Sequence, residues 1–134
     1  MTPRRSVLVV DPTAETREVL RTALEQRGLL TMGASRAEHA LAMAREYAPD
    51  LIVLDLEADA SPNEHWTSEV ARQSRLGDTP LVLLGSARGR KLLAHEQFVA
   101  KPYHYGPLIR KIESLLEEAM PPLATSGERT ARSA

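Results

Sequence analysis

Short apolar runs of strand length recur along this chain, and each is separated from the next by a segment with helical periodicity. The runs occupy residues 6–10 (SVLVV), 29–33 (LLTMG), 51–54 (LIVL), 81–84 (LVLL) and 97–100 (QFVA). Runs that are apolar at consecutive positions are typical of strands buried on both faces. Because strands that alternate with helices build parallel sheets covered on both sides, we expect a doubly wound α/β fold with strand order 2-1-3-4-5.

Five helices are expected between and after these strands. Gly28 is a natural end for the first helix, and Pro62 suits the first turn of the third. The expected helices cover residues 13–27, 35–48, 62–75 and 87–95, and a last one opens at Pro107. Residues 120–134 hold two prolines and then small polar residues, which predicts a disordered tail or linker stub after a domain at residues 1–119.

Composition excludes several classes of protein. The 134 residues are 43% hydrophobic and 26% charged, which suits one domain with its own core. The net charge of -1 provides no global positive field, so no direct nucleic-acid binding is expected. The absence of cysteine excludes disulfides and thiolate metal sites. The apolar run at residues 7–10 is too short for a secretory signal or a membrane span, which favours a cytoplasmic protein with no membrane contact.

Charged and small polar residues stand where the expected strands end. Asp11 follows the first strand, Asp55 the third, Gly85 and Ser86 the fourth, and Lys101 the fifth. In a doubly wound sheet, ligands bind outside the carboxyl ends of the strands. The pattern therefore predicts two carboxylates, a hydroxyl and an ammonium at one edge of the sheet.

These residue types together suit phosphoryl transfer to a carboxylate. A carboxylate beside Mg²⁺ can attack a phosphoryl donor and become an acyl phosphate. Asp11 and Asp55 would supply hard oxygen ligands to Mg²⁺, and the backbone carbonyl of Glu57 a third. Lys101 would pair with the phosphoryl oxygens, and the Ser86 hydroxyl would also contact them.

Four sequence blocks carry a family resemblance. They are VLVVD (residues 7–11), PDLIVLDLE (49–57), TPLVLLGSA (79–87) and FVAKPY (98–103). Their order and content resemble response-regulator receiver domains of two-component signalling, over residues 6–118. The resemblance implies a flavodoxin-like fold, with Asp55 as the phosphoacceptor, Asp11 in the acidic pocket and Lys101 as the conserved-type lysine. It also implies that Phe98 is the aromatic switch residue and that the Lys101–Pro102 peptide bond is cis.

The same resemblance implies a role and partners. A histidine kinase or phosphotransfer protein would supply the phosphoryl group in a phosphorelay, and a downstream protein target would read it. A homodimer is left open. The only chemistry expected of the chain is transfer to its own Asp55 and hydrolysis there, so it is not expected to be an enzyme in the ordinary sense.

Three departures from the family pattern bear on the site. Pro12 stands where receivers carry a second acid that ligates the metal, which predicts weakened Mg²⁺ binding, with Asp59 as a candidate substitute ligand. Gly85 fills the Ser/Thr switch position, and Ser86 comes one residue late. The interval from Gly85 to Lys101 is shorter than usual by roughly a turn and a half of helix.

Three functions compete on this evidence. A phosphoaccepting receiver is favoured by Asp55 and Lys101. A degenerate receiver that acts as a phosphorylation-independent protein-interaction module is favoured by Pro12, Gly85 and the short interval before Lys101. A nucleotide- or flavin-binding doubly wound protein is disfavoured, because no glycine-rich loop follows the first strand.

Overall fold

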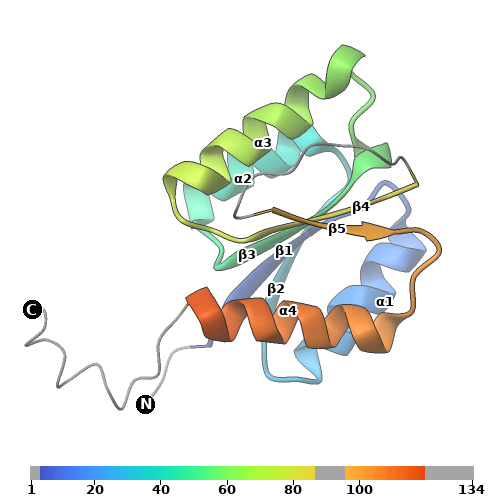
Figure 1. Cartoon of the computed structure of the whole chain (residues 1–134), viewed down its shortest axis with the longest axis vertical. Coiled ribbons are helices and arrows are strands. Elements are labelled where there is room, and N and C mark those ends of the chain that lie inside the picture. The colour runs from blue at the N-terminus through green and yellow to red at the C-terminus, as the bar shows by residue number, and fades with distance from the viewer. Residues whose placement is uncertain (1–3, 87–95, 120–134) are drawn as a thin grey trace, which may run out of the picture.

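The chain folds around a single five-stranded parallel sheet in the order β2-β1-β3-β4-β5 (Figure 1). The computed structural model describes residues 4–86 and 96–119. The strands are β1 (Ser6–Val10), β2 (Leu30–Ala34), β3 (Leu51–Asp55), β4 (Leu81–Gly85) and β5 (Glu96–Ala100). The helices are α1 (Ala14–Glu25), α2 (Ala37–Tyr47), α3 (His65–Leu76) and α4 (Tyr105–Ala119), with short 3-10 turns η1 (Leu56–Ala58) and η2 (Pro62–Glu64). The predicted fold class and strand order are confirmed.

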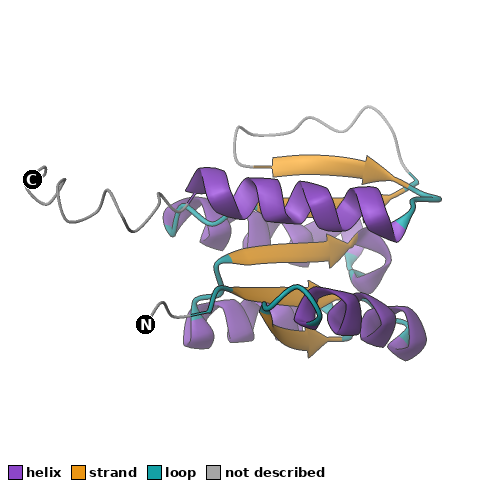
Figure 2. Cartoon of the chain, turned by 90° about the horizontal axis from the view of Figure 1, so that it is seen from below, coloured by secondary structure: helices purple, strands orange, loops and turns teal. Residues whose placement is uncertain are grey.

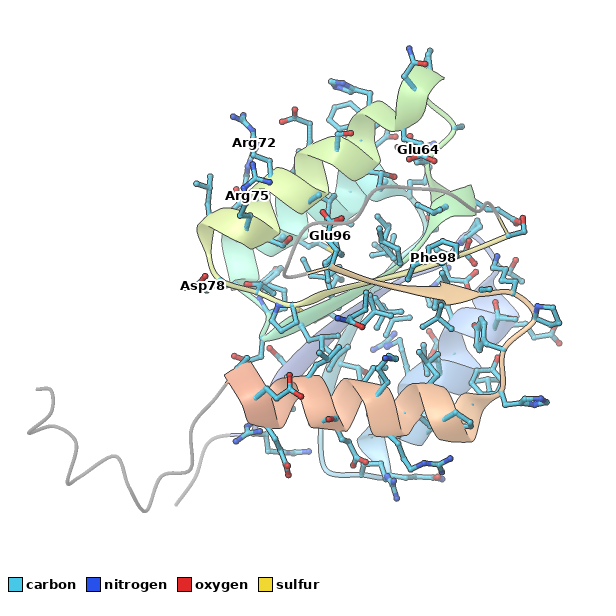
Figure 3. All side chains as sticks on the ribbon, viewed as in Figure 1. Glu64, Arg72, Arg75, Asp78, Glu96 and Phe98 are labelled. Carbon is cyan, nitrogen blue, oxygen red and sulfur yellow. The ribbon has the colours of Figure 1, made fainter. Side chains whose placement is uncertain are left out.

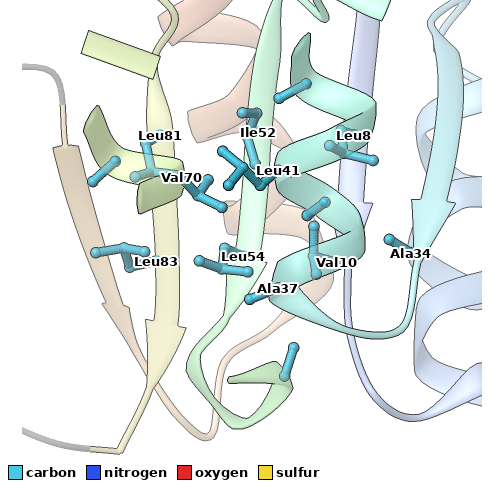
Figure 4. Close-up of a cluster of buried hydrophobic side chains, with 14 residues drawn as sticks. Leu8, Val10, Ala34, Ala37, Leu41, Ile52, Leu54, Val70, Leu81 and Leu83 are labelled. Atoms are coloured by element: carbon cyan, nitrogen blue, oxygen red, sulfur yellow. The ribbon is translucent and has the colours of Figure 1, made fainter. Parts of the chain in front are cut away.

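The helices cover both faces of the sheet, with α2 and α3 on one side and α1 and α4 on the other (Figures 1 and 2). Successive residues of a strand point to opposite faces, so each central strand needs apolar residues at every position. In β1, Leu8 and Val10 pack under α2 and α3 (Figure 4), whereas Val7 and Val9 pack under α1 and α4. This double burial explains why the strands read as unbroken apolar runs.

The strand registers bring the expected site residues to one edge. Val10 pairs with Leu54, Asp55 with Leu84, and Gly85 with Ala100, so β1, β3, β4 and β5 end at nearly the same level. The backbone N–H of Lys101 donates to the Gly85 carbonyl at 2.9 Å, which continues the β4–β5 pairing by one residue. The carboxyl ends of these strands therefore share one edge of the sheet.

The third and last helices begin at residues other than those expected from the sequence. The third helix begins at His65, not at Pro62, because Asn63 and Glu64 adopt left-handed backbone angles with φ of 55° and 54°. Left-handed residues cannot continue a right-handed helix, so the segment from Pro62 forms only a 3-10 turn. The last helix begins at Tyr105, and Pro107 lies in its first turn, where a missing N–H costs nothing.

Two sequence expectations fall outside the described residues. These are the helix at residues 87–95 and the tail at residues 120–134. No helix within residues 4–86 and 96–119 has the length and apolar character needed to cross a membrane.

Candidate functional site

A pocket of about 540 Å³ opens at the carboxyl edge of the sheet. Its lining joins the ends of β1, β3 and β5 to the first turns of α1 and α4. The lining residues are Asp11, Thr13, Thr16, Asp55, Glu57, Lys101, Pro102, Tyr103 and Tyr105. Four of the residues expected at a phosphoryl-transfer site, namely Asp11, Asp55, Glu57 and Lys101, thus share one pocket.

Asp55 is the last residue of β3 and is only 3% exposed. Its Oδ1 accepts a hydrogen bond from the Glu57 backbone N–H at 2.9 Å, which caps the 3-10 turn η1. Its Oδ2 lies 2.6 Å from the Lys101 ammonium nitrogen. A buried carboxylate is costly unless it is paired and hydrogen-bonded, and Asp55 has both kinds of partner.

Lys101 directly follows β5, and its peptide bond to Pro102 is cis, as predicted. Its ammonium nitrogen also lies 3.6 Å from Oε2 of Glu57. Burial lowers the pKa of Lys101, but the hydrogen bond and charge of Asp55, with smaller effects from Glu57 and Asp11, outweigh burial and raise it above its usual value. Lys101 is therefore a fixed cation in this pocket at neutral pH.

Asp11 follows β1, and both of its carboxylate oxygens accept hydrogen bonds from α1 or the residue before it. Oδ1 accepts from the Thr13 backbone N–H at 2.8 Å, and Oδ2 accepts from the Thr16 hydroxyl at 2.9 Å. The Arg17 guanidinium donates to the Asp11 carbonyl at 2.7 Å. Sequence reasoning missed Thr16, although its place in the first turn after a strand-terminal aspartate was a usable signal.

The donor set of the pocket fits Mg²⁺. Asp11, Asp55 and the carbonyl of Glu57 are hard oxygen donors, and an open pocket leaves room for the waters that this ion retains. Among the described residues, no group of three carboxylate or imidazole side chains is close enough to form a metal site by itself. Pro12 is exposed and brings no carboxylate at the position where the resemblance implies a second acid. The residues present therefore fit Mg²⁺ with few protein ligands.

Asp59 belongs to the start of α3, not to the pocket. Its Oδ2 accepts from the Thr67 backbone N–H at 2.7 Å, and its Oδ1 accepts from the backbone N–H and the hydroxyl of Ser61. Partial burial raises its pKa, but these hydrogen bonds together lower the pKa below its usual value. The structure thus gives Asp59 a capping role, and it does not line the pocket as a substitute ligand.

Two tyrosines form a wall of the pocket that the sequence reasoning did not anticipate. The rings of Tyr103 and Tyr105 pack edge to face, with centroids 5.7 Å apart. Burial, the neighbouring Tyr105 and the negative charges of Asp11 and Asp55 raise the pKa of Tyr103 to about 12. Tyr103 is therefore a neutral hydroxyl beside the carboxylates at physiological pH.

The expected switch residues Gly85 and Phe98, and the second expected phosphate contact Ser86, do not line this pocket. Gly85 is buried at the end of β4, and Ser86 is exposed; neither lines the pocket. Phe98 is partly buried and packs against the core cluster under α2 and α3 (Figure 3). Ser86 thus lies at the carboxyl edge of the sheet, as expected from the sequence. Its contact with phosphate stays a prediction.

Solved structures with the same fold are receiver domains. A response regulator receiver protein from Sinorhizobium medicae aligns with a TM-score of 0.75 at 24% identity, over 87% of this chain and 98% of that one. The receiver domain of the hybrid histidine kinase CckA aligns with a TM-score of 0.69 at 21% identity, over 84% and 99%. The chemotaxis response regulator CheY4 of Vibrio cholerae gives 0.69 at 20% identity, over the same shares. The chain thus has the receiver-domain fold of two-component response regulators.

Curated relatives extend the likeness to sequence. The phosphate regulon transcriptional regulatory protein PhoB of Escherichia coli is 27% identical over 124 residues, or 87% of this chain and 54% of the relative. The probable transcriptional regulator ycf27 of Porphyra purpurea is 29% identical over 119 residues, or 87% and 49%. The chain spans about half the length of these relatives. No family model matches the chain. PhoB and ycf27 are sequence homologues, so the resemblance to response-regulator receivers is confirmed.

Proposed function

We propose that this chain accepts a phosphoryl group on Asp55 from a histidine kinase or phosphotransfer protein. The observation that carries this proposal is the buried Asp55 carboxylate, with Lys101 at 2.6 Å and Asp11 in the same pocket. A nucleophilic carboxylate, a cation for the phosphoryl oxygens and a second acid for a metal are what acyl-phosphate formation requires.

In the proposed reaction, an Asp55 carboxylate oxygen attacks phosphorus as the bond from phosphorus to the donor histidine nitrogen breaks. The electron pair of that bond returns to the histidine, and Asp55 becomes an acyl phosphate. The Glu57 N–H holds Asp55 Oδ1, which leaves Oδ2 as the oxygen that faces Lys101. Lys101 then moves its ion pair from the carboxylate to the phosphoryl oxygens. Bound Mg²⁺, held by Asp11, Asp55 and the Glu57 carbonyl, would neutralise charge on the phosphoryl group.

Output is proposed to pass through contacts with a downstream protein target, in the cytoplasm, with a homodimer among the arrangements to be tested. Ser86 and Phe98 are proposed to respond to the phosphoryl group, Ser86 by its hydroxyl and Phe98 by its packing under α3. Since these residues do not line the pocket, their response would follow a movement of the loop or strand that carries them.

The experiment is incubation of the folded chain with acetyl phosphate and Mg²⁺, followed by intact-mass measurement. We expect slow addition of one phosphoryl group to the native chain and none to Asp55→Asn. Addition that persists in Asp55→Asn would show that the wrong residue was named.

A second candidate function is a receiver that binds its partners without phosphorylation. Gly85, which offers no hydroxyl, and Pro12, which offers no metal ligand, favour it. This candidate predicts no mass increase on folded protein with any small phosphodonor. It also predicts that partner binding is the same for the native chain and Asp55→Asn.

A further inference from the structure

The side chain of Leu56 lies across the end of β4, in the space that a side chain at position 85 would need. A Cβ atom added to Gly85 would lie 2.8 Å from Cδ1 of Leu56, 3.3 Å from Cγ and 3.5 Å from Cβ. Carbon atoms in ordinary contact are about 3.5–4.0 Å apart. Position 85 therefore accepts no side chain while Leu56 keeps its place.

Leu56 cannot yield this space by a rotation of its end alone. Turning the terminal methyl relieves the contact at 2.8 Å, but Cγ still lies 3.3 Å from the new atom. Leu56 is partly buried against the core cluster under α2 and α3, and Ala58 at the other end of η1 is 6% exposed. A side chain at position 85 therefore requires Leu56 to take another rotamer against this cluster, or the turn η1 to shift.

A movement of this turn reaches the phosphoacceptor directly. Leu56 follows Asp55 in the chain, and the next N–H, that of Glu57, donates to Asp55 Oδ1 at 2.9 Å. On the other side, the Gly85 carbonyl accepts from the backbone N–H of Lys101 at 2.9 Å. Gly85 thus lies between the turn that orients Asp55 and the residue that carries its cationic partner.

We propose that Leu56 is a positioning residue for Asp55, and that position 85 is glycine because Leu56 fills the space beside it. This inference rests on the proposed function and deepens it. It gives the glycine at position 85 a packing reason, beyond its departure from the Ser/Thr switch position of the family pattern. Here a side chain at position 85 displaces Leu56, shifts η1 and loosens the hydrogen bond from Glu57 to Asp55.

The experiment compares the native chain with Gly85→Ser, Leu56→Ala, Leu56→Met and the double variant Gly85→Ser/Leu56→Ala. Three quantities are measured for each: the maximal rate and the half-saturating concentration for phosphoramidate with Mg²⁺, and the Glu57 amide proton shift by NMR. Gly77→Ala is the matched control, since Gly77 lies beyond α3 at the other end of the sheet and its added Cβ meets only Thr79 Oγ1 and the Gln73 carbonyl.

We expect Gly85→Ser to lower the maximal rate about tenfold, with little change in the half-saturating concentration, because the nucleophile is misplaced while the donor still binds. Trimming Leu56 in the double variant should return the rate to within about threefold of Leu56→Ala, which is the non-additivity expected of residues in contact. Leu56→Met fills similar volume and should stay close to native. The Glu57 amide should shift in Gly85→Ser and Leu56→Ala, but not in Leu56→Met or Gly77→Ala.

Two results would overturn the proposal. One is a Gly85→Ser chain that takes phosphoryl groups as fast as the native chain with an unchanged Glu57 amide shift. The other is a Leu56→Ala chain with native rate and native shift, which also decides the question if Gly85→Ser does not fold. If the native chain takes no phosphoryl group, the proposed function fails, whereas the amide shifts still test whether Leu56 positions the turn.

Discussion

The ammonium nitrogen of Lys101 lies 2.6 Å from Oδ2 of Asp55, and the two side chains are 25% and 5% exposed. Lys101 is the residue after β5, and Asp55 is the last residue of β3. The strand β4 runs between β3 and β5. The pair therefore spans the strand that ends in Gly85. It links the nucleophile of the proposed reaction to the cation that would receive the phosphoryl oxygens.

Replacing Lys101 by methionine should change phosphorylation and metal binding in opposite directions. The phosphoryl oxygens lose their cationic partner, so the rate of labelling by acetyl phosphate should fall about tenfold or more. Removing a positive charge from a pocket that holds Asp11, Asp55 and Glu57 should also tighten Mg²⁺ binding, by about tenfold. Calorimetry measures the affinity, and mass spectrometry measures the labelling. Lys111→Met, an exposed lysine on α4, is the control. Weaker Mg²⁺ binding in Lys101→Met would contradict this account of the pocket.

Tyr103 should make the fold less stable between about pH 10 and 12. Its pKa is raised to about 12 in the folded chain, so in this range the unfolded chain ionises at Tyr103 while the folded chain keeps the proton. The folded state then binds more protons, and the free energy of unfolding falls as pH rises. Urea unfolding at pH 9 and pH 11 should show a smaller loss of stability in Tyr103→Phe than in the native chain. Tyr47→Phe, at a tyrosine that is 55% exposed, serves for comparison. Equal losses in all three chains would refute the prediction.

Asp59→Ala should destabilise the fold by about 1–2 kcal/mol at pH 7, because it removes the acceptor of the Thr67 N–H in the first turn of α3 and of the Ser61 N–H before η2. The pKa of Asp59 is lowered in the folded chain, so the contribution is present above its unfolded value of 3.8 and is lost as pH falls through the lower folded value. Thermal melts of native and Asp59→Ala chains should therefore converge in strong acid. Glu46→Ala, at an exposed position on α2, is the control. Mg²⁺ affinity should be unchanged, and a large loss of affinity would restore Asp59 as a metal ligand.

Pro12→Asp should tighten Mg²⁺ binding by roughly ten- to a hundredfold, or about 1–3 kcal/mol, because a carboxylate beside Asp11 repays part of the cost of dehydrating the ion. Pro12→Asn separates charge from the loss of the proline ring, and it should gain far less affinity. The same change removes a residue with fixed φ from the loop before α1, so a thermal melt should accompany the calorimetry. Equal affinity in the native and Pro12→Asp chains would mean that the second acid is not needed here.

The strands, their order and the meeting of Asp11, Asp55 and Lys101 at one edge of the sheet were predictable because they follow from local pattern. Runs such as residues 51–54 must be buried on both faces, and parallel strands with right-handed crossovers end at a common edge. Asp11, Asp55 and Lys101 each stand directly after or at the end of such a run, so their meeting follows from the topology. The start of α3 was misjudged because left-handed residues at 63 and 64 carry no strong local signal.

The remaining features depend on contacts between segments far apart in the sequence or on the exact path of a turn. Thr16 reaches Asp11 because α1 begins at Ala14, directly after the short loop that follows β1. Tyr103 and Tyr105 line the pocket of Asp11 and Asp55 because the segment after β5 ends at the same edge of the sheet. The sequence shows only that Gly85 lacks the hydroxyl of a Ser or Thr. The fold shows that the Leu56 side chain occupies the space beside Gly85. Sequence pattern determines which residues reach the edge of the sheet, since strand periodicity is local. Packing decides what each of them touches there, since a side chain's neighbours are set by the segments that fold against it.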